Sequence, residues 1–214
     1  VVCHEKIDIC EKLVKENLGV ELVIHMDPIE TDNEEIDAAK QKQWIDAGKE
    51  LITISVNISR IHLLEATLVE DIRAIVDKYG LPHSCIELEL TESAFFDDKK
   101  LLLDTVKKLR DSGFCVSMDD FGAGYSSLNS LKEMHIDVLK IDADFFRGVD
   151  EQERGQLIVS EVIDLAKKLD MKIVAEGIES REQVDFLTEQ ECDLIQGYFF
   201  AKPMPAEEFA QKYR

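Results

Sequence analysis

Two adjacent carboxylates, Asp119 and Asp120, follow a short apolar stretch, and a glycine, Gly122, comes two residues after Asp120. The residues before them (114–116, FCV) are typical of a buried strand, and the glycine-containing run after them is typical of a loop. Two carboxylates held side by side repel each other unless a cation compensates their charge. A divalent metal site is therefore the first hypothesis for this pair, and an Asp pair that only caps a turn is the alternative.

The same arrangement recurs along the chain, because other short apolar runs also end in a polar or charged residue. The residues at these ends are Asn57, Glu89, Lys140, Glu176 and Gln196. In a (β/α) barrel the carboxyl ends of the strands converge on one face, where active sites lie. The sequence therefore predicts one shared site built from these strand ends, with separate solvated loop residues as the alternative.

The chemistry of this set is compatible with metal-assisted hydrolysis of a phosphodiester. Carboxylates and an Asn carbonyl are ligands that Mg²⁺ and Mn²⁺ prefer. Two such cations about 3.5–4 Å apart polarise a phosphodiester and activate a water molecule for in-line attack. Lys140 would add positive charge beside the phosphate oxygens. Its place between Leu139 and Ile141 favours this role over that of a surface lysine.

Charge and composition exclude several classes of protein. The 214 residues include 25 basic and 45 acidic side chains, a net charge of −20. A DNA-binding groove built on basic residues is therefore excluded, although divalent metals can still bring a phosphodiester to an acidic protein. Five scattered cysteines without a CxxC pair predict reduced thiols and a cytoplasmic protein. No apolar run approaches the ~20 residues of a membrane span, and no signal-peptide pattern is present.

Strand and helix patterns alternate with short connections, which predicts one α/β domain without a linker. At the N-terminal end, the pattern predicts a helix over 5–18, a strand over 20–24 and a helix around Trp44. Further helices are predicted over 62–79, 99–111, 126–134, 151–169, 180–190 and 205–213. The strands add up to one fewer than a barrel of eight needs. We expect the missing strand to belong between Pro28 and Trp44.

The motifs resemble those of the EAL family, the cyclic di-GMP phosphodiesterases and their catalytically silent relatives. They are VNIS (56–59), ELTES (89–93), DDFGAGYSSL (119–128), KID (140–142), AEGIE (175–179), QGY (196–198) and KPMP (202–205). The resemblance implies a TIM-like (β/α)8 barrel of EAL type with an antiparallel first strand. It implies one EAL-like domain over 1–214: a helix or connector over 1–19, a truncated or atypical part over 20–49, and a well-matched part over 50–214.

Carried over residue by residue, the resemblance implies a site of two Mg²⁺ or Mn²⁺ ions. Asn57, Glu89 and Asp119 would bind the first metal. Asp119 would bridge to the second metal, where Asp120 would be a ligand. Glu176 would lie close to the second metal or reach it through water.

The resemblance also implies roles around the metals. Lys140 resembles the lysine that holds the attacking water or the phosphate. Glu92 and Glu179 resemble supporting residues, with Glu92 steadying the loop after the paired aspartates; a carboxylate at a helix start is the alternative for Glu92. Gln196 and Pro203 resemble contacts to a guanine and its surroundings.

The chain departs from the family pattern in its N-terminal part. The Glu-Ala-Leu tripeptide that names the family is absent, and Asp27-Pro28-Ile29 is the nearest match to the family's Gln-Pro strand. If this segment has been lost, one metal ligand and a phosphate-binding arginine are lost with it. The other explanation is that the sequence omits residues of the natural protein. We favour this second explanation, since a chain freed from catalysis would not need its other metal-facing side chains.

The leading hypothesis is therefore a bacterial signalling enzyme that hydrolyses cyclic di-GMP to linear pGpG. The alternative is a catalytically inactive EAL-like module that serves as a cyclic di-GMP receptor or binds a protein partner. A hydrolase of another phosphodiester is a third possibility, because barrels host many chemistries. The resemblance also implies a homodimer, formed near the loop after the paired aspartates and the helix that follows. Sensor or diguanylate cyclase domains are expected in a longer natural chain.

Overall fold

The computed structural model describes residues 7–10, 23–26, 33–48, 51–59, 62–91, 99–122, 128–146, 153–204 and 208. The strands are β1 (Ile7–Cys10), β2 (Val23–Met26), β3 (Thr53–Asn57), β4 (Ile86–Thr91), β5 (Cys115–Phe121), β6 (Val138–Ile141), β7 (Lys172–Ala175) and β8 (Leu194–Ile195). The α-helices are α1 (Asn33–Asp46), α2 (Leu68–Lys78), α3 (Lys99–Asp111), α4 (Leu128–Glu133), α5 (Ala143–Phe146), α6 (Glu153–Lys168) and α7 (Arg181–Glu189). Two 3₁₀ turns are η2 (His62–Leu64) and η3 (His83–Cys85).

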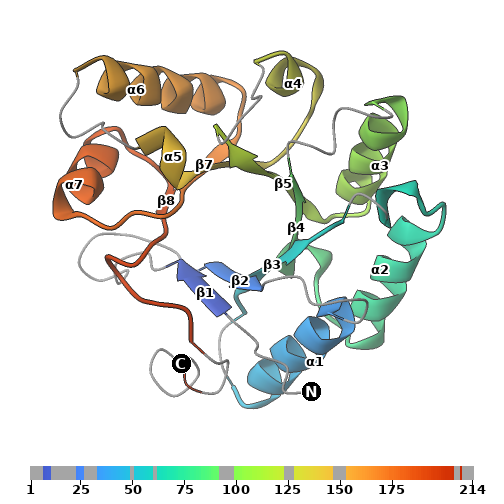
Figure 1. Cartoon of the computed structure of the whole chain (residues 1–214). Coiled ribbons are helices and arrows are strands. Elements are labelled where there is room, and N and C mark those ends of the chain that lie inside the picture. The colour runs from blue at the N-terminus through green and yellow to red at the C-terminus, as the bar shows by residue number, and fades with distance from the viewer. Residues whose placement is uncertain are drawn as a thin grey trace.

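The strands form one curved sheet in the order of the sequence, from β1 to β8. Strands β2 to β8 are parallel to their neighbours, and β1 is antiparallel to β2. The strands curl around a common centre, with the helices outside them (Figure 1). Within the described residues, no pairing joins β8 to β1. The fold is thus an α/β fold in which the carboxyl ends of consecutive parallel strands meet at one edge.

The first strands differ from the sequence-based predictions. The helix predicted over 5–18 was wrong at Ile7–Cys10, which forms β1; all of its other residues lie outside the described part. The two isoleucines of β1 alternate with polar residues, a period of two that fits a strand once β2 can pair with it. The predicted first strand, over 20–24, corresponds to β2, and β2 pairs in parallel with β3. The sheet does begin with an antiparallel strand, but this strand is β1 and not the segment predicted over 20–24.

The prediction of a missing strand was also wrong in its count. The interval between Pro28 and Trp44 contains the start of α1, and β1 brings the number of strands in the sheet to eight. Later in the chain the predicted helices correspond to α2, α3, α4, α6 and α7. The short helix α5 was not predicted, and the helix predicted over 205–213 lies almost entirely outside the described residues.

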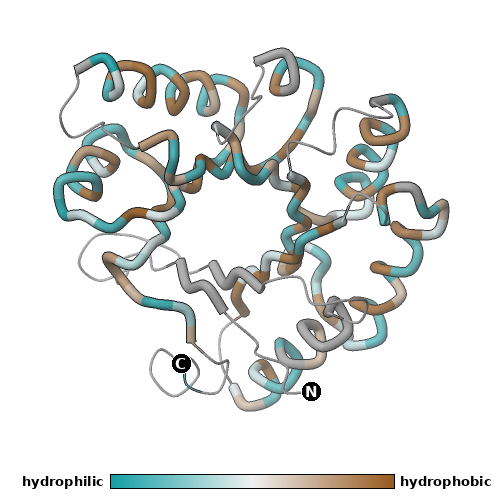
Figure 2. The backbone as a smooth tube through the Cα atoms, viewed as in Figure 1, coloured by the Kyte–Doolittle hydropathy of each residue, from teal (hydrophilic) through white to brown (hydrophobic). Residues whose placement is uncertain are grey.

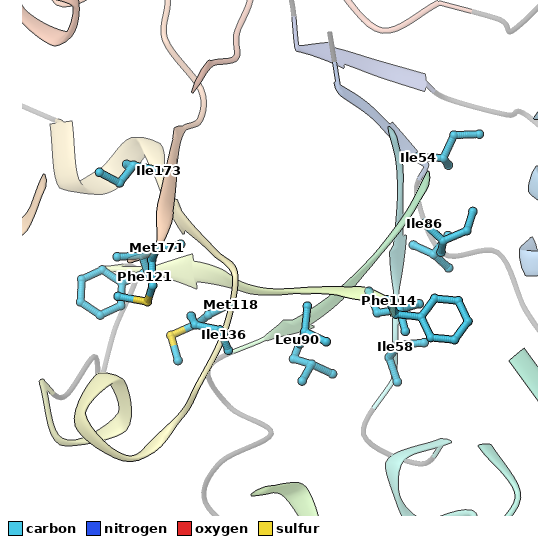
Figure 3. Packing of buried hydrophobic residues seen from close by; sticks show 14 of the residues in the cluster. Ile54, Ile58, Ile86, Leu90, Phe114, Met118, Phe121, Ile136, Met171 and Ile173 are labelled. Atoms are coloured by element: carbon cyan, nitrogen blue, oxygen red, sulfur yellow. The ribbon is translucent and has the colours of Figure 1, made fainter. Parts of the chain in front are cut away.

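The two faces of the sheet have different chemistry. In β4, the buried apolar residues Ile86 and Leu90 alternate with the buried acids Glu87 and Glu89. In Figure 3, the side chains of Ile86 and Leu90, and of Met118 on β5, point outward from the curved sheet. Apolar and polar residues also alternate along α3 and α6, which cover this outer face (Figure 2). Because side chains alternate between the faces of a strand, the two glutamates lie on the inner face of the curved sheet.

Candidate active site

The predicted site residues lie at the carboxyl ends of consecutive parallel strands or directly after them. In strand order they are Asn57, Glu89, Asp119, Lys140, Glu176 and Gln196. Asn57 is in register with Glu89, and Lys140 with Val174, two residues before Glu176. The sheet thus gathers side chains that are far apart in the sequence at one edge, as predicted.

Lys140 lies at the centre of this group and is 0% exposed. Its ammonium group forms an ion pair with Glu89, lies 3.2 Å from Oε1 of Glu176 and 3.9 Å from Oε1 of Glu87. Burial lowers the pKa of Lys140, but the surrounding carboxylates outweigh burial and hold its pKa well above the ordinary value. Lys140 is therefore a buried cation surrounded by carboxylates from β4 and from the residues just after β7, and is not a surface lysine.

The paired aspartates occupy different environments. Asp119 is 7% exposed, and burial together with the negative charges of Glu176 and Glu89 raises the pKa of its carboxyl to about 7. Asp120 is exposed, and its backbone has a φ of 58°, in the left-handed region. The register of β5 against β6 shifts at this point, and the N–H of Asp120 donates a hydrogen bond to Oδ1 of Asp119. This irregularity lies just before the end of β5, and it separates the two carboxylates into a buried and an exposed one.

Glu87 is a site residue that the sequence analysis did not single out. It is 3% exposed and accepts a hydrogen bond of 3.3 Å from the hydroxyl of Ser55. Burial raises the pKa of Glu87; the charge of Lys140 lowers it and that of Glu89 raises it again. The available signal was its spacing, because a residue two positions before Glu89 on a strand lies on the same face.

A pocket of about 260 Å³ adjoins the carboxylates. Its lining residues are Asp142, Ala143, Glu176, Gly177, Glu179, Gln196, Gly197, Tyr198 and Ala201. Glu176, Glu179 and Gln196 are thus brought together, as expected for neighbouring site residues. Pro203 does not line this pocket, and Glu92 and residues 123–127 of the predicted loop lie outside the described part.

Two glycines let the backbone approach closely beneath this pocket. A Cβ atom at Gly197 would lie 2.0 Å from the carbonyl oxygen of Ile178, and one at Gly177 would lie 2.4 Å from Cβ of Ala143. The N–H of Ile178 donates a hydrogen bond of 2.9 Å to the carbonyl of Gln196. The glycines that follow Glu176 and Gln196 therefore fix the positions of these two side chains relative to each other.

The donor atoms of this site fit a hard divalent cation. Asn57, Glu89, Asp119 and Glu176 carry oxygen donor atoms of the kind such a cation prefers, and the raised pKa of Asp119 indicates an excess of negative charge. In the described part of the chain, however, no three acidic, histidine or cysteine side chains are close enough together to coordinate one ion. Glu89 and Glu176 both lie against Lys140. Metal binding at these residues therefore requires a rearrangement around Lys140.

No helix in the described residues has the length and hydrophobicity that a membrane span needs.

The comparisons with known proteins show the family. The model of the EAL domain matches residues 34–203, so the chain belongs to the EAL domain family. It is 39% identical over 171 residues to the cyclic di-GMP phosphodiesterase NbdA of Pseudomonas aeruginosa. This match covers 78% of the chain and 22% of NbdA, so the chain spans about a fifth of the length of this relative.

Solved structures agree with this membership. The EAL domain of Mycobacterium smegmatis DcpA superimposes with a TM-score of 0.85 at 27% identity, over 97% of this chain and 94% of that one. The PaMucR phosphodiesterase in complex with c-di-GMP gives a TM-score of 0.78 at 28% identity, over 96% and 92% of the two chains. The curved parallel sheet described above is therefore the EAL domain fold.

Proposed function

We propose that this chain hydrolyses cyclic di-GMP to linear pGpG with the help of divalent cations, Mg²⁺ or Mn²⁺. The observation that carries the proposal is the group of buried carboxylates around Lys140 at the carboxyl edge of the sheet. The substrate is supported by the relatives, since NbdA is named a cyclic di-GMP phosphodiesterase and PaMucR was solved with c-di-GMP.

In this proposal the carboxylates bind the cations, and Lys140 interacts with the phosphate of the substrate. Asn57, Glu89 and Asp119 would hold the first cation; Asp119, Asp120 and Glu176 would hold the second. When bound, the cations would polarise the phosphodiester and lower the pKa of the attacking water. The water oxygen attacks phosphorus, the bond from phosphorus to the ribose 3′ oxygen breaks, and that oxygen takes up a proton. The ammonium group of Lys140 would stabilise the charge that develops on the phosphate oxygens.

The pocket beside Glu176 is proposed to hold one guanine base. The amide of Gln196 can both donate and accept hydrogen bonds, and the carboxylates of Asp142 and Glu179 can accept from the N–H groups of a guanine edge. We assign Pro203 to the surroundings of the base, and Glu92 to the support of the loop that follows the paired aspartates. Both assignments rest on the family motifs.

The assembly and setting of the chain are part of the same proposal. We infer a cytoplasmic signalling protein that forms a homodimer, in which the loop after the paired aspartates couples assembly to metal binding. Sensor or diguanylate cyclase domains would accompany this domain in a longer chain, in keeping with the length of NbdA.

A catalytically inactive module that binds cyclic di-GMP is the second candidate. It is favoured by the absence of the Glu-Ala-Leu tripeptide and by the ion pair that Lys140 makes with Glu89, a proposed metal ligand. Loss of one carboxylate from a two-metal site would lower the rate by several orders of magnitude. Binding of cyclic di-GMP without turnover would identify this candidate.

Hydrolysis of cyclic di-GMP by the 214-residue chain tests the proposal directly. Reactions with Mn²⁺ and with EDTA are separated by chromatography, and linear pGpG is expected only with the metal. Asp119→Ala should abolish hydrolysis and weaken metal binding, because the carboxylate would contact both cations. Turnover close to that of the wild type in this variant would contradict the site assignment.

A further inference from the structure

Two carboxylates that pair with Lys140, those of Glu89 and Glu176, are also proposed metal ligands. The ammonium group of Lys140 pairs with Glu89 and lies 3.2 Å from Glu176, and both carboxylates would have to turn to a bound cation. Lys140 is 0% exposed, so a small movement of its side chain would not bring the ammonium group into contact with water. A buried ammonium group without a carboxylate beside it is strongly destabilising. Metal binding therefore requires another anion for Lys140.

Glu87 is the carboxylate placed to fill this need. It lies on the same face of β4 as Glu89, one layer deeper in the sheet, with Oε1 3.9 Å from Nζ of Lys140. Its hydrogen bonds are long: 3.3 Å from the hydroxyl of Ser55 and 3.9 Å from the thiol of Cys115. Glu87 and Cys115 also line a cavity of about 450 Å³ at the opposite end of the sheet, so the carboxyl group has room to adjust.

We propose that Glu87 is a positioning residue, which holds the ammonium group of Lys140 in the site when a divalent cation takes over Glu89 and Glu176. This inference rests on the metal binding in the proposed function. Glu87 itself binds neither metal nor substrate. Its action on the site passes through Lys140, so its effect on metal affinity depends on the presence of that lysine.

Two substitutions separate this role from a general effect of charge. In Glu87→Gln, a bound cation would have to compete with Lys140 for the remaining carboxylates, so Mn²⁺ affinity should fall by at least about tenfold. In Lys140→Met no ammonium competes for Glu89 and Glu176, so Mn²⁺ should bind more tightly than in the wild type. In the double variant, Glu87→Gln should change the affinity of the Lys140→Met protein by less than about threefold.

The experiment is calorimetric titration of the metal-free chain with Mn²⁺ for the wild type, the two single variants and the double variant. Glu87→Asp keeps the charge, so its Mn²⁺ affinity should stay within about threefold of that of the wild type. If Glu87→Gln does not fold, the Glu87→Asp variant still tests the inference, because a loss of affinity much larger than threefold would contradict it. Glu70→Gln, the same chemical change at an exposed site on α2, is the matched control and should leave the affinity unchanged.

An equal loss of affinity with and without Lys140 would overturn the inference, because Glu87 would then act on the metal by its own charge. Unchanged affinity in Glu87→Gln, or no Mn²⁺ binding by the wild type, would overturn it as well. Hydrolysis of cyclic di-GMP by the same samples reports separately on the proposed function. The expected affinities without any pGpG would retain Glu87 as a positioning residue and reject the phosphodiesterase.

Discussion

The ionisation of Asp119 and Lys140 depends on their shared surroundings. Carboxylates raise the pKa of the buried lysine above its ordinary value, and the same carboxylates, with burial, raise that of Asp119 to about 7. One ammonium group therefore does not compensate the negative charge of this cluster. A divalent cation would neutralise the remaining negative charge. This expectation follows from the arrangement of charges alone, without reference to related proteins.

The affinity for Mn²⁺ should consequently depend on pH in a defined range. The cation binds the deprotonated carboxylate, so a proton on Asp119 competes with it. Below a pKa of about 7 each unit of pH should weaken binding by up to about tenfold, and above pH 7 the affinity should level off. Titrations at pH 6, 7 and 8 measure this. Asp119→Asn should bind weakly at all three, and equal wild-type affinities at pH 6 and 8 would refute the expectation.

Most residues of the candidate site could be predicted from the sequence because polar residues at strand ends interrupt long apolar patterns. Asn57, Glu89, Asp119 and Lys140 stand out in this way. Glu87 could not be recognised by the same rule, since it lies within its strand and not at the end. Its spacing from Glu89 places it on the same face of β4, and its burial and its contact with Lys140 show that it belongs to the site.

At the scale of elements, the QGY turn after β8 determines where Gln196 lies. Gly197→Ala would place a Cβ atom 2.0 Å from the carbonyl oxygen of Ile178, so the backbone must shift. We expect a loss of about 1–3 kcal/mol in unfolding free energy and weaker cyclic di-GMP binding. Urea unfolding and calorimetry measure the two effects. Gly80→Ala is the control: it also has a positive φ but no atom within 4 Å, and should lower stability without changing binding.

A substitution at the C-terminus of α6 should stabilise the fold. Asp170 has a φ of 58°, and the N–H groups of Asp170 and Met171 bond to the carbonyls of Lys167 and Ala166 in a Schellman motif. Glycine adopts this conformation without strain, and Asp170→Gly also removes a negative charge from a helix C-terminus. We expect a gain of about 0.5–1 kcal/mol in urea unfolding. Asp164→Gly, within the same helix, should instead destabilise by about 1 kcal/mol, and equal signs would contradict this explanation.

Predictions of elements succeeded where periodicity and tertiary pairing agree. The amphipathic pattern of α6 and the alternating acids of β4 are long enough to be read without ambiguity. At Ile7–Cys10 the stretch is four residues long, and its state is decided by pairing with β2, which no local pattern records. The strand count was one too low for the same reason. The antiparallel strand of the sheet is formed by residues 7–10, which had been predicted as part of a helix.

At the scale of the whole molecule, the sheet concentrates charge inside while the helices cover its outside. The net charge of −20 and the carboxylates at the carboxyl edge both favour the approach of cations to this edge. The EAL model matches from residue 34 onward, so the part of the fold supplied by β1 and β2 precedes the matched region. Activity measured on the 214-residue chain is therefore the direct test of whether these strands complete the site.

The outer surface of α6 is the place where we expect the homodimer to form. Leu157 is 60% exposed and Ile158 is 47% exposed on this helix. In the ring of helices drawn in Figure 1, α6 is the next long helix after α4, the helix that follows the paired aspartates in the sequence. Burying two large apolar side chains at an interface contributes several kcal/mol to association, whereas a charge in their place opposes it.

Leu157→Glu should convert the dimer to a monomer and lower hydrolysis at protein concentrations where the wild type is dimeric. Sedimentation velocity over a hundredfold range of concentration measures the first effect, and turnover measured over the same range tests the second. Leu51→Glu makes the same change at a residue that is 42% exposed but lies before β3, away from α6, and should leave the dimer intact. A wild-type chain that stays monomeric would contradict the predicted dimer. Activity that does not change with concentration across the transition would show that hydrolysis at the EAL site does not depend on dimer formation.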